Sequence, residues 1–373
     1  MHIAVVSNTA WYLFNFRLNL MRALVAQGHE VVAIAPHDMY AEFIRAAGVT
    51  FESVPLSGAG LNPLREARTV WALGKLFRRH RIDVVLSYTP KGNLYSAIAC
   101  MANRLPFIPN VSGLGRAFTQ PSIVTHVARL LYRLTFRHAH HVFFQNLDDM
   151  QAFVTWRLVS PAKASRLPGS GVDLSHFSPQ PMPAKGPDVG VRFLLVARLL
   201  WDKGIGEYVA AARRVLAVHP QTRFSLLGQL GVDNPSAIAE AQIATWVAAG
   251  TIRYLGATDD VRPHLAHADC VVLPSYREGV PRTLLEAAAT ARPVITTDAP
   301  GCRDTVRNGV TGFMCQPKDA VDLARQMLAF IDLPTEDRQS MGQQGRALME
   351  SAFSEQIVLG QYLARLQDLA RAP

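Results

Sequence analysis

Short apolar runs alternate with amphipathic stretches along almost the whole chain. The apolar runs suit strands buried on both faces, and the stretches between them repeat apolar residues every three or four positions, as helices do. Strands are expected at 2–7, 30–35, 50–55, 84–87, 107–111 and 141–145, and again at 191–196, 224–228, 252–256, 270–273, 294–297 and 312–315. Helices are expected at 14–27, 40–47, 64–80, 93–103, 122–138 and 148–155, and again at 207–218, 235–248, 261–266, 281–291, 320–330 and 343–370.

This strict alternation predicts an α/β protein with parallel sheets that carry helices on both faces. It is interrupted once, by a Gly-, Ser- and Pro-rich segment at 169–187. At 373 residues the chain also exceeds the size at which a single core stops growing. We therefore expect two Rossmann-like domains joined near 170–188, with a cleft between them and functional loops at the carboxyl ends of the strands.

The stretch 270–289 concentrates the candidate chemistry. An apolar run is followed by a polar loop, and Pro281 then suits the first position of a helix that ends before Pro293. Glu278 lies in the loop and Glu286 about one turn into the helix. Two hydrogen-bond acceptors beside a helix N-terminus, which attracts phosphate, suit a sugar nucleotide. The alternative is that both glutamates are solvated surface charges.

Two cations follow the first strand of the C-terminal half. Arg198 and Lys203 flank a turn between that strand and the next helix. Cations at such a turn suit a diphosphate, which arginine grips with two hydrogen bonds. The alternative is again a pair of surface cations. The run 252–256 ends in glycine, where the backbone is open to a nucleobase.

Three loops after strands of the N-terminal half are candidates for a second site. The loop 8–15 lacks the GxGxxG pattern of dinucleotide-binding proteins, which argues against a dehydrogenase. The loop 88–93 contains one cation, Lys91, in front of a helix. The loop 112–116 contains glycines that permit close approach of the backbone to a ligand. Each loop is equally well explained as an ordinary turn.

The net charge of +9 belongs entirely to the N-terminal half. Residues 1–175 contain 18 Lys and Arg against 9 Asp and Glu, whereas residues 176–373 contain 20 of each kind. The helices at 64–80 and 122–138 are rich in arginine. Either these arginines lie along the edges of ordinary domain helices, which is slightly favoured, or they bind anionic lipid headgroups.

No uncharged apolar run of about 18 residues and no signal peptide is present, so we expect a cytoplasmic protein that meets the membrane only at its surface. The four cysteines lack CxxC spacing, and His138, His140 and His141 straddle a helix end and a strand start. Neither set predicts a metal site. The basic charge raises nucleic-acid binding as an alternative, but no recognised module or aromatic ladder accompanies it.

A set of motifs, taken in order, resembles the family 4 retaining glycosyltransferases of GT-B fold, and the resemblance covers nearly the whole chain. The motifs are Gly169-Ser-Gly-Val-Asp173, Phe177-Ser-Pro179, Ala197-Arg198, Lys203-Gly204 and Glu278-x7-Glu286. Within this family the chain looks most like bacterial enzymes that extend undecaprenyl-diphosphate-linked sugars, in particular α-1,3-N-acetylgalactosaminyltransferases. The motifs that match are Phe14-Asn-Phe-Arg17, Leu61-Asn-Pro63, Lys91-x-Asn93, Gly113-Leu-Gly115, Ala197–Gly204, Tyr254-Leu-Gly256 and Leu273–Gly279. Those enzymes have a glutamate where this chain has Ser112.

The resemblance implies that residues 171–354 bind a UDP-sugar. Arg198 and Lys203 would bind the diphosphate, Glu286 the ribose hydroxyls and Glu278 the hydroxyls of the transferred sugar. Arg198, Lys203 and Glu278 are the residues implied in catalysis. The other residues implied to contact the donor are Tyr254 and Leu255 at the uracil and Gly279, Val280 and Pro281 beside the sugar.

The resemblance also implies that residues 1–170 bind the acceptor, with a C-terminal helix at about 355–373 crossing back onto this domain. The residues implied on the acceptor side are Asn15, Arg17, Lys91, Asn93, Gly113 and Gly115. No metal or other cofactor is expected, because two cations and a helix N-terminus suffice to stabilise the leaving UDP and the sequence has no Asp-x-Asp. No side chain stands out as a base, and the leaving phosphate would take the proton.

The expected activity is transfer, with retention, of a sugar from a UDP-sugar to an undecaprenyl-diphosphate-linked saccharide. The favoured sugar is N-acetylgalactosamine. The expected setting is the inner face of the cell membrane, in bacterial surface-polysaccharide or glycoprotein glycan synthesis. The alternative on the same fold is a UDP-sugar epimerase or hydrolase, which consumes the donor without a lipid acceptor.

Overall fold

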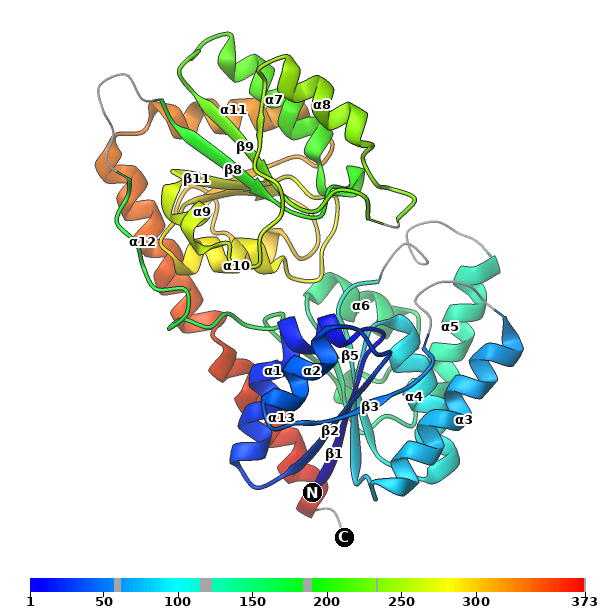
Figure 1. Ribbon diagram of the computed structural model, residues 1–373. Coiled ribbons are helices and arrows are strands. Elements are labelled where there is room, and N and C mark those ends of the chain that lie inside the picture. Colours follow the sequence, from blue (N-terminus) through cyan, green and yellow to red (C-terminus); the bar gives the residue numbers. More distant parts are fainter. Residues whose placement is uncertain (57–61, 115–122, 184–189, 233, 372–373) are drawn as a thin grey trace. The chain divides into compact units, whose positions relative to one another are not determined.

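The chain folds into two compact α/β units (Figure 1). The computed structural model describes residues 1–56, 62–114, 123–183, 190–232 and 234–371. Unit 1 consists of Met1–Ser170 together with Val358–Pro373, and unit 2 consists of Gly171–Ile357. Each unit is built on one parallel sheet, so the expectation of two Rossmann-like domains is confirmed.

Unit 1 contains a seven-stranded sheet in the order β3-β2-β1-β4-β5-β6-β7. Its strands are β1 (His2–Val6), β2 (Glu30–Ala35), β3 (Thr50–Ser53), β4 (Val84–Tyr88), β5 (Phe107–Val111), β6 (Val142–Phe144) and β7 (Ala164–Arg166). Its helices are α1 (Ala10–Ala26), α2 (Tyr40–Ala46), α3 (Pro63–Arg79), α4 (Pro90–Asn103), α5 (Ile123–Phe136), α6 (Leu147–Thr155), the 3-10 helix η2 (Pro161–Lys163) and most of α13 (Glu355–Arg371). The strand order reverses between β1 and β4, which is where ligands bind in sheets of this kind.

Unit 2 contains a six-stranded sheet in the order β10-β9-β8-β11-β12-β13. Its strands are β8 (Arg192–Val196), β9 (Arg223–Leu227), β10 (Arg253–Tyr254), β11 (Cys270–Leu273), β12 (Val294–Thr297) and β13 (Gly312–Cys315). Its helices are η3 (Trp201–Lys203), α7 (Ile205–Leu216), α8 (Glu240–Ala248), α9 (Arg262–His267), α10 (Arg282–Ala289), η4 (Arg303–Thr305), α11 (Ala320–Asp332) and α12 (Thr335–Ala352). Here the strand order reverses between β8 and β11.

Both sheets are covered on their two faces. In β1, Ala4 and Val6 belong to one apolar core, while Ile3 and Val5 belong to another. Unit 2 likewise has one core on each face of its sheet. Burial of both strand faces explains why the strands are continuous apolar runs rather than alternating ones. Within the described residues, no helix is long and apolar enough to cross a bilayer.

Most helix boundaries differ modestly from expectation, for reasons that are local. Helix α1 begins at Ala10 because the Thr9 hydroxyl accepts a hydrogen bond from the Tyr12 amide, which caps the helix earlier than its apolar pattern suggests. The expected helix at 343–370 is two helices, because Phe353 and Ser354 separate α12 from α13. Strand β7 was not expected, and β10 is shorter than expected.

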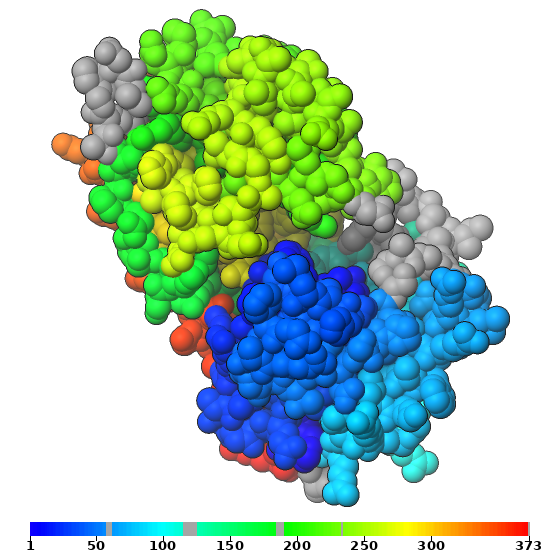
Figure 2. All heavy atoms as spheres, viewed as in Figure 1, coloured from blue at the N-terminus to red at the C-terminus, as the bar shows by residue number. Residues whose placement is uncertain are grey.

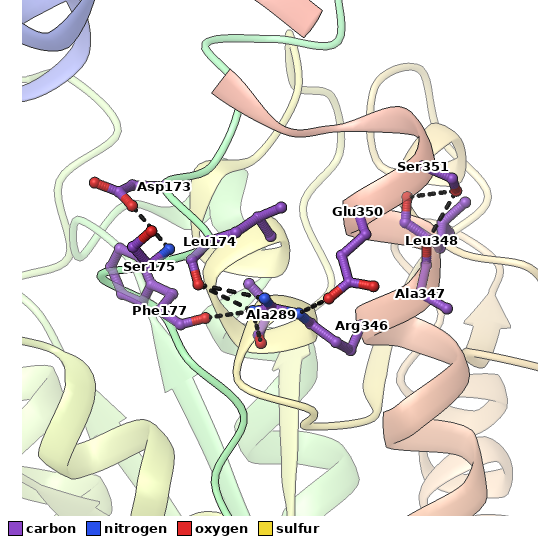
Figure 3. Close-up of polar contacts among 10 residues, drawn as sticks. All are labelled: Asp173, Leu174, Ser175, Phe177, Ala289, Arg346, Ala347, Leu348, Glu350 and Ser351. Atoms are coloured by element: carbon purple, nitrogen blue, oxygen red, sulfur yellow. Dashed lines mark hydrogen bonds and ion pairs between the residues drawn. The ribbon is translucent and has the colours of Figure 1, made fainter. Parts of the chain in front are cut away.

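The segment that leads into unit 2 is held by an arginine of α12 (Figure 3). The Arg346 guanidinium donates hydrogen bonds to the carbonyl oxygens of Phe177 at 2.7 Å and Ala289 at 2.9 Å, and also to that of Leu174. Its Nε lies 2.6 Å from a carboxylate oxygen of Glu350. One side chain therefore ties the motif around Phe177 to the end of α10 and to α12.

Candidate functional site

Three loops meet at the carboxyl edge of the sheet in unit 2. They follow β8, β11 and β12, and they contain the turn 202–204, the loop 274–281 and the turn 300–301. The amide of Tyr276 donates to the carbonyl of Asp202 at 3.0 Å, and the amide of Glu278 donates to the carbonyl of Pro300 at 3.0 Å. The loop that carries Glu278 is therefore fixed by backbone hydrogen bonds on both sides.

Two glycines allow this close packing of backbones. A Cβ on Gly204 would lie 2.0 Å from the Pro274 carbonyl oxygen, and a Cβ on Gly301 would lie 2.2 Å from the Gly279 carbonyl oxygen. Both glycines also have positive φ angles, +71° and +80°. Any side chain at either position would push the loops apart and displace Glu278.

Lys203 and Glu278 form an ion pair at this edge although they lie 75 positions apart in the sequence. Their side chains are 18% and 14% exposed, so the pair is shielded but open to solvent on one side. The Ser275 hydroxyl donates a hydrogen bond of 2.7 Å to the same carboxylate oxygen of Glu278. The structure thus brings together the cation and the carboxylate that the sequence pointed to.

Glu286 lies in α10 and pairs with Arg282 one turn earlier, with 2.6 Å between Nε and the carboxylate oxygen. Burial raises the pKa of the Glu286 carboxyl, and the Arg282 charge opposes that shift. Pro281 is the N-cap residue rather than the first helical residue, and α10 begins at Arg282. Its side chain makes no capping hydrogen bond, so no cap side chain competes with a ligand at this helix end.

The remaining donor-side residues lie near the same strands. Arg198 lies two residues after the end of β8, and it is exposed. Tyr254 is half-buried, and its hydroxyl donates to the Gly228 carbonyl at 2.8 Å. Leu255 lines a groove together with Arg253 and His264. Since side chains of an extended chain point alternately to the two faces, this groove lies on the face away from the Tyr254 side chain. Val280 and Gly279 are half-buried in the loop before α10.

Several contacts at this edge were not expected from the sequence. The Tyr276 hydroxyl donates to a carboxylate oxygen of Glu207 at 2.7 Å, and the ammonium of Lys318 lies 5.0 Å from the centre of the Tyr276 ring. The Thr283 hydroxyl donates to the Val196 carbonyl at 3.2 Å. Tyr276 lies inside the Leu273–Gly279 motif, but nothing local in the sequence marks Glu207 or Lys318 as its neighbours.

In unit 1, Arg17 is 1% exposed. One guanidinium nitrogen donates to the Tyr12 hydroxyl at 3.1 Å, and the guanidinium carbon lies 4.2 Å from the centre of the Tyr88 ring. Burial alone would lower the pKa of Arg17, but the phenol oxygens of Tyr12, Tyr88 and Tyr362 more than offset this and raise it. A side chain this enclosed contacts the protein interior, and its role on the acceptor side stays a prediction.

Asn93 is also 1% exposed and is fully engaged in the fold. It accepts a hydrogen bond from the Ser87 hydroxyl at 2.9 Å and donates one to the Asn110 carbonyl at 2.9 Å. Asn110 in turn donates to the Tyr362 hydroxyl of α13 at 3.1 Å. These contacts join the four elements β4, α4, β5 and α13.

The other acceptor-side residues are more open. Lys91 forms an ion pair with Glu66 at 2.8 Å, so its charge already has a partner from α3. The Asn15 amide donates to the Trp11 carbonyl at 2.9 Å. Gly113 is half-buried with a φ of +136°, and Gly115 lies outside the described residues. Thr89, just before α4, has a φ of +67°, which is strained for a β-branched residue and typical of functional loops.

Among the residues that the structure describes, no group of three or more His, Cys, Asp or Glu side chains is arranged to hold a metal ion. The four cysteines are free and buried.

Two family models match consecutive parts of the chain. Residues 16–170 match the model described as a glycosyl transferase 4-like domain, and residues 190–332 match the model described as glycosyl transferases group 1. The first match lies in unit 1 and the second in unit 2.

Characterised relatives share similarity over most of the chain. An N,N'-diacetylbacillosaminyl-diphospho-undecaprenol alpha-1,3-N-acetylgalactosaminyltransferase of Campylobacter jejuni is 27% identical, with 89% of this chain and 90% of the relative covered. A UDP-Gal:alpha-D-GlcNAc-diphosphoundecaprenol alpha-1,3-galactosyltransferase of Escherichia coli is 24% identical, with 71% and 70% covered.

Solved structures share the fold. The Anabaena protein HepE, crystallised in complex with UDP and glucose, superposes with a TM-score of 0.79 at 17% identity, and the match covers 99% of both chains. Sucrose-phosphate synthase from Thermosynechococcus elongatus superposes with a TM-score of 0.80 at 19% identity, over all of both chains.

Proposed function

The chain belongs to the family 4 glycosyltransferases of GT-B fold, and from this premise we propose that it transfers a sugar from a UDP-sugar to an undecaprenyl-diphosphate-linked saccharide. The observation that carries the proposal is the meeting of Lys203 and Glu278 beside α10 at the carboxyl edge of the unit 2 sheet. A diphosphate needs cations and helix amides, and a sugar needs carboxylate acceptors. This edge supplies both kinds of group.

The ion pair accounts for how the donor binds in this proposal. Without ligand, Glu278 neutralises the Lys203 charge, which is largely shielded from water. When the diphosphate arrives, it takes the place of the carboxylate beside Lys203, and Arg198 grips it from the exposed side. Glu278, held by Ser275, is then free to accept hydrogen bonds from the hydroxyls of the transferred sugar.

The rest of the donor follows from the positions of neighbouring residues. Glu286 accepts hydrogen bonds from the ribose hydroxyls, after exchanging its contact with Arg282. Tyr254 and Leu255, at the end of β10, are proposed to line the uracil. The backbone of Gly279, Val280 and Pro281 runs beside the sugar and leads into the amides of α10.

The chemistry proposed is transfer with retention. Negative charge grows on the UDP oxygen as the glycosidic bond breaks, and Arg198, Lys203 and the α10 amides stabilise it without a metal. The acceptor hydroxyl approaches on the face that UDP leaves, and the departing phosphate takes its proton. Lys203 thereby serves both binding and catalysis, since its charge matters more as the bond breaks.

The acceptor is proposed to bind at the carboxyl edge of unit 1, near Lys91, Asn15 and Gly113. The favoured sugar is N-acetylgalactosamine, because the Campylobacter relative named above transfers it to a diphospho-undecaprenol carrier. Ser112 stands where enzymes of that kind have a glutamate, so the acceptor glycan is expected to differ at this position.

Membrane attachment is proposed to use two helices of unit 1. On α5, Val127, Leu130 and Leu134 form an exposed apolar stripe, with Arg133 on the same helix and Arg137 just after its end. Helix α3, light blue at the surface in Figure 2, carries exposed cations along its length. Each cation near an anionic surface contributes about 1 kcal/mol. We propose that the enzyme works at the inner face of the membrane, where it would meet its lipid-linked acceptor.

The donor is tested by thermal unfolding with UDP-, GDP- and dTDP-sugars. A ligand at about 100 times its dissociation constant stabilises the folded state by about 2.7 kcal/mol, which is readily measured. UDP compounds are expected to raise the melting temperature, and a response to another nucleotide alone would refute the donor assignment.

The reaction is tested by incubating the protein with UDP-N-acetylgalactosamine and a diphospholipid-linked saccharide, followed by mass and anomeric analysis of the lipid product. An extended saccharide with an α linkage is expected. Consumption of the UDP-sugar at the same rate without acceptor would instead identify an epimerase or hydrolase.

A further inference from the structure

An apolar groove of about 480 Å³ runs along the outside of unit 1, between α3 and α4. Its walls include Val70 and Trp71 from α3 and Ile98 from α4. The Trp71 side chain is 65% exposed, which is a large apolar area to leave in water. The groove is within the size range of pockets that bind organic ligands.

Small residues create this groove. Ala67 and Gly74 on α3 face Ala99 and Ala102 on α4, so few side-chain atoms fill the space between the helices. At one end the helices approach closely, because a Cβ on Gly74 would lie 3.0 Å from the Asn103 amide nitrogen. The groove is therefore lined mainly by carbon, which suits an unbranched or isoprenoid hydrocarbon chain.

Polar groups mark the two ends of the groove. At the carboxyl edge of the sheet, Glu66 and Lys91 form an ion pair, and Lys91 also lies 5.9 Å from the centre of the Tyr95 ring. At the other end, the Arg78 guanidinium donates to the Asn103 side chain at 2.7 Å. The groove thus begins beside the first turn of α4, which carries Lys91, the cation expected on the acceptor side.

Cations also follow the groove along the exposed face of α3. Leu64, Arg68, Trp71, Lys75 and Arg78 are spaced at every third or fourth position, so they share one face, and all are exposed. The ammonium of Lys75 lies 5.6 Å from the centre of the Trp71 ring. A carbon-lined groove bordered by this many cations is complementary to a hydrocarbon chain that ends in phosphate.

We propose that this groove binds the isoprenoid units next to the diphosphate of the lipid-linked acceptor. The inference rests on the proposed function, which supplies an acceptor of that chemistry. Here α3 and α4 take up the first part of the chain, and the saccharide is directed to the edge where Lys91 lies.

Binding of farnesyl diphosphate to the full-length protein tests this, with inorganic diphosphate as the reference ligand. Titration calorimetry below the micellar concentration is expected to show that farnesyl diphosphate binds at least ~10-fold more tightly, because each buried methylene adds favourable free energy. Equal affinity for the two ligands would overturn the proposal.

A matched pair of variants locates the binding. Ala102→Trp fills the groove from an exposed position, whereas Met101→Trp adds the same side chain at the next residue, which does not line the groove. Ala102→Trp is expected to remove the preference for the farnesyl chain, and Met101→Trp to retain it. Equal affinities of the two variants for farnesyl diphosphate would overturn the proposal. A change of oligomeric state in Ala102→Trp would also overturn it, because it would show that the groove binds a second copy of the chain.

The binding assay does not depend on catalysis. A protein that fails to transfer sugar but keeps the groove-dependent preference for farnesyl diphosphate would refute the proposed function and leave the groove assignment standing. The reverse result, a protein that transfers sugar but binds farnesyl diphosphate no more tightly than inorganic diphosphate, would refute the groove assignment alone.

Discussion

The two units have the same kind of parallel sheet, and both place polar residues after their central strands, but they use those residues differently. In unit 2, Lys203 and Glu278 remain 18% and 14% exposed and neutralise each other. In unit 1, Arg17 and Asn93 are each 1% exposed and bond to other parts of the core. A motif at a strand end therefore specifies a position in the fold, while its neighbours decide whether a ligand reaches it.

The difference follows from what surrounds each cation. Lys203 has a carboxylate partner that a phosphate is able to replace. Arg17 is surrounded by the aromatic rings of Tyr12 and Tyr88, and the phenol of Tyr362 from α13 also acts on its charge. The cation of unit 2 is exchangeable, and that of unit 1 is built into the core. Four predictions test this contrast, and they are given from the largest expected effect to the smallest.

Arg17→Ala is expected to lower the free energy of unfolding by about 3–5 kcal/mol, because it leaves a cavity and removes the hydrogen bond to Tyr12. Chemical denaturation of the variant and the parent measures this. Arg17→Met, which fills most of the same volume, is expected to recover much of the loss. A fully stable Arg17→Ala protein that no longer transfers sugar would place Arg17 with the ligand-binding residues instead.

Lys203→Ala is expected to reduce kcat by about 100- to 1000-fold, equivalent to about 3–4 kcal/mol, with little loss of stability. Steady-state transfer assays and a melting curve separate the two effects. Arg223→Ala serves as the control, because Arg223 is an exposed cation at the start of β9, at the opposite edge of the same sheet. An equal loss of rate in both variants would show that net charge, rather than position, matters.

Asn93→Ala is expected to cost about 2 kcal/mol of stability, since it leaves the Ser87 hydroxyl and the Asn110 carbonyl without their buried partner. The KM for the donor is expected to stay unchanged. If Asn93→Ala raises the KM for the acceptor while the melting temperature holds, the residue binds ligand directly and the contrast between the units weakens.

Acidification is expected to act on the two units in opposite directions. Burial and the nearby charges of Arg365 and His140 lower the pKa of His141 to about 4 in the folded protein. In the unfolded chain the same histidine is protonated already below about pH 6.5, so protons bind more strongly to the unfolded state. Unit 1 should therefore lose up to about 2 kcal/mol as the pH falls from 6.5 to 4. Burial raises the pKa of Glu286, so protonation on acidification favours folded unit 2.

Melting curves of His141→Gln and Glu286→Gln between pH 4 and pH 7.5 check the signs. His141→Gln is expected to flatten the acid loss, and Glu286→Gln is expected to be more stable than the parent at pH 7.5. Identical pH profiles for the parent and both variants would contradict the assignment of these shifts.

The strands and the loops that follow them were predictable from the sequence, because burial on both faces leaves short apolar runs bounded by turn residues. The expected donor residues were found on one edge of one sheet. The pairing of Lys203 with Glu278 was not predictable from local pattern, since it depends on β8 and β11 being neighbours although β9 and β10 intervene in the chain. The short strand β7, at the edge of its sheet, gave too little apolar pattern to detect.

The burial of individual polar residues also could not be predicted from the sequence. The run from Phe14 to Arg17 shows an amphipathic helix, but not that Tyr88 and Tyr362 close over the guanidinium from distant parts of the chain. Gly204 and Gly301 could be recognised as turn residues. The sequence does not show, however, that each of them leaves room for a carbonyl oxygen of the loop that carries Glu278, because that loop is distant in the chain from Gly204 and meets both glycines only in the fold.

The route of α13 has a consequence for how the protein is made. Val358, Tyr362 and Leu366 fill the same apolar core as Ile3 and Val5 of the first strand. Unit 1 therefore cannot complete its core until α13 has been made, while unit 2 is contiguous and completes earlier. Translation of Gly171–Ile357 takes roughly 10–40 s, and during that time the part of this face that α13 covers stays open, although α1 and α2 already pack on the rest of it. A nascent chain released before Val358 leaves that apolar area exposed, as a substrate for chaperones and proteases.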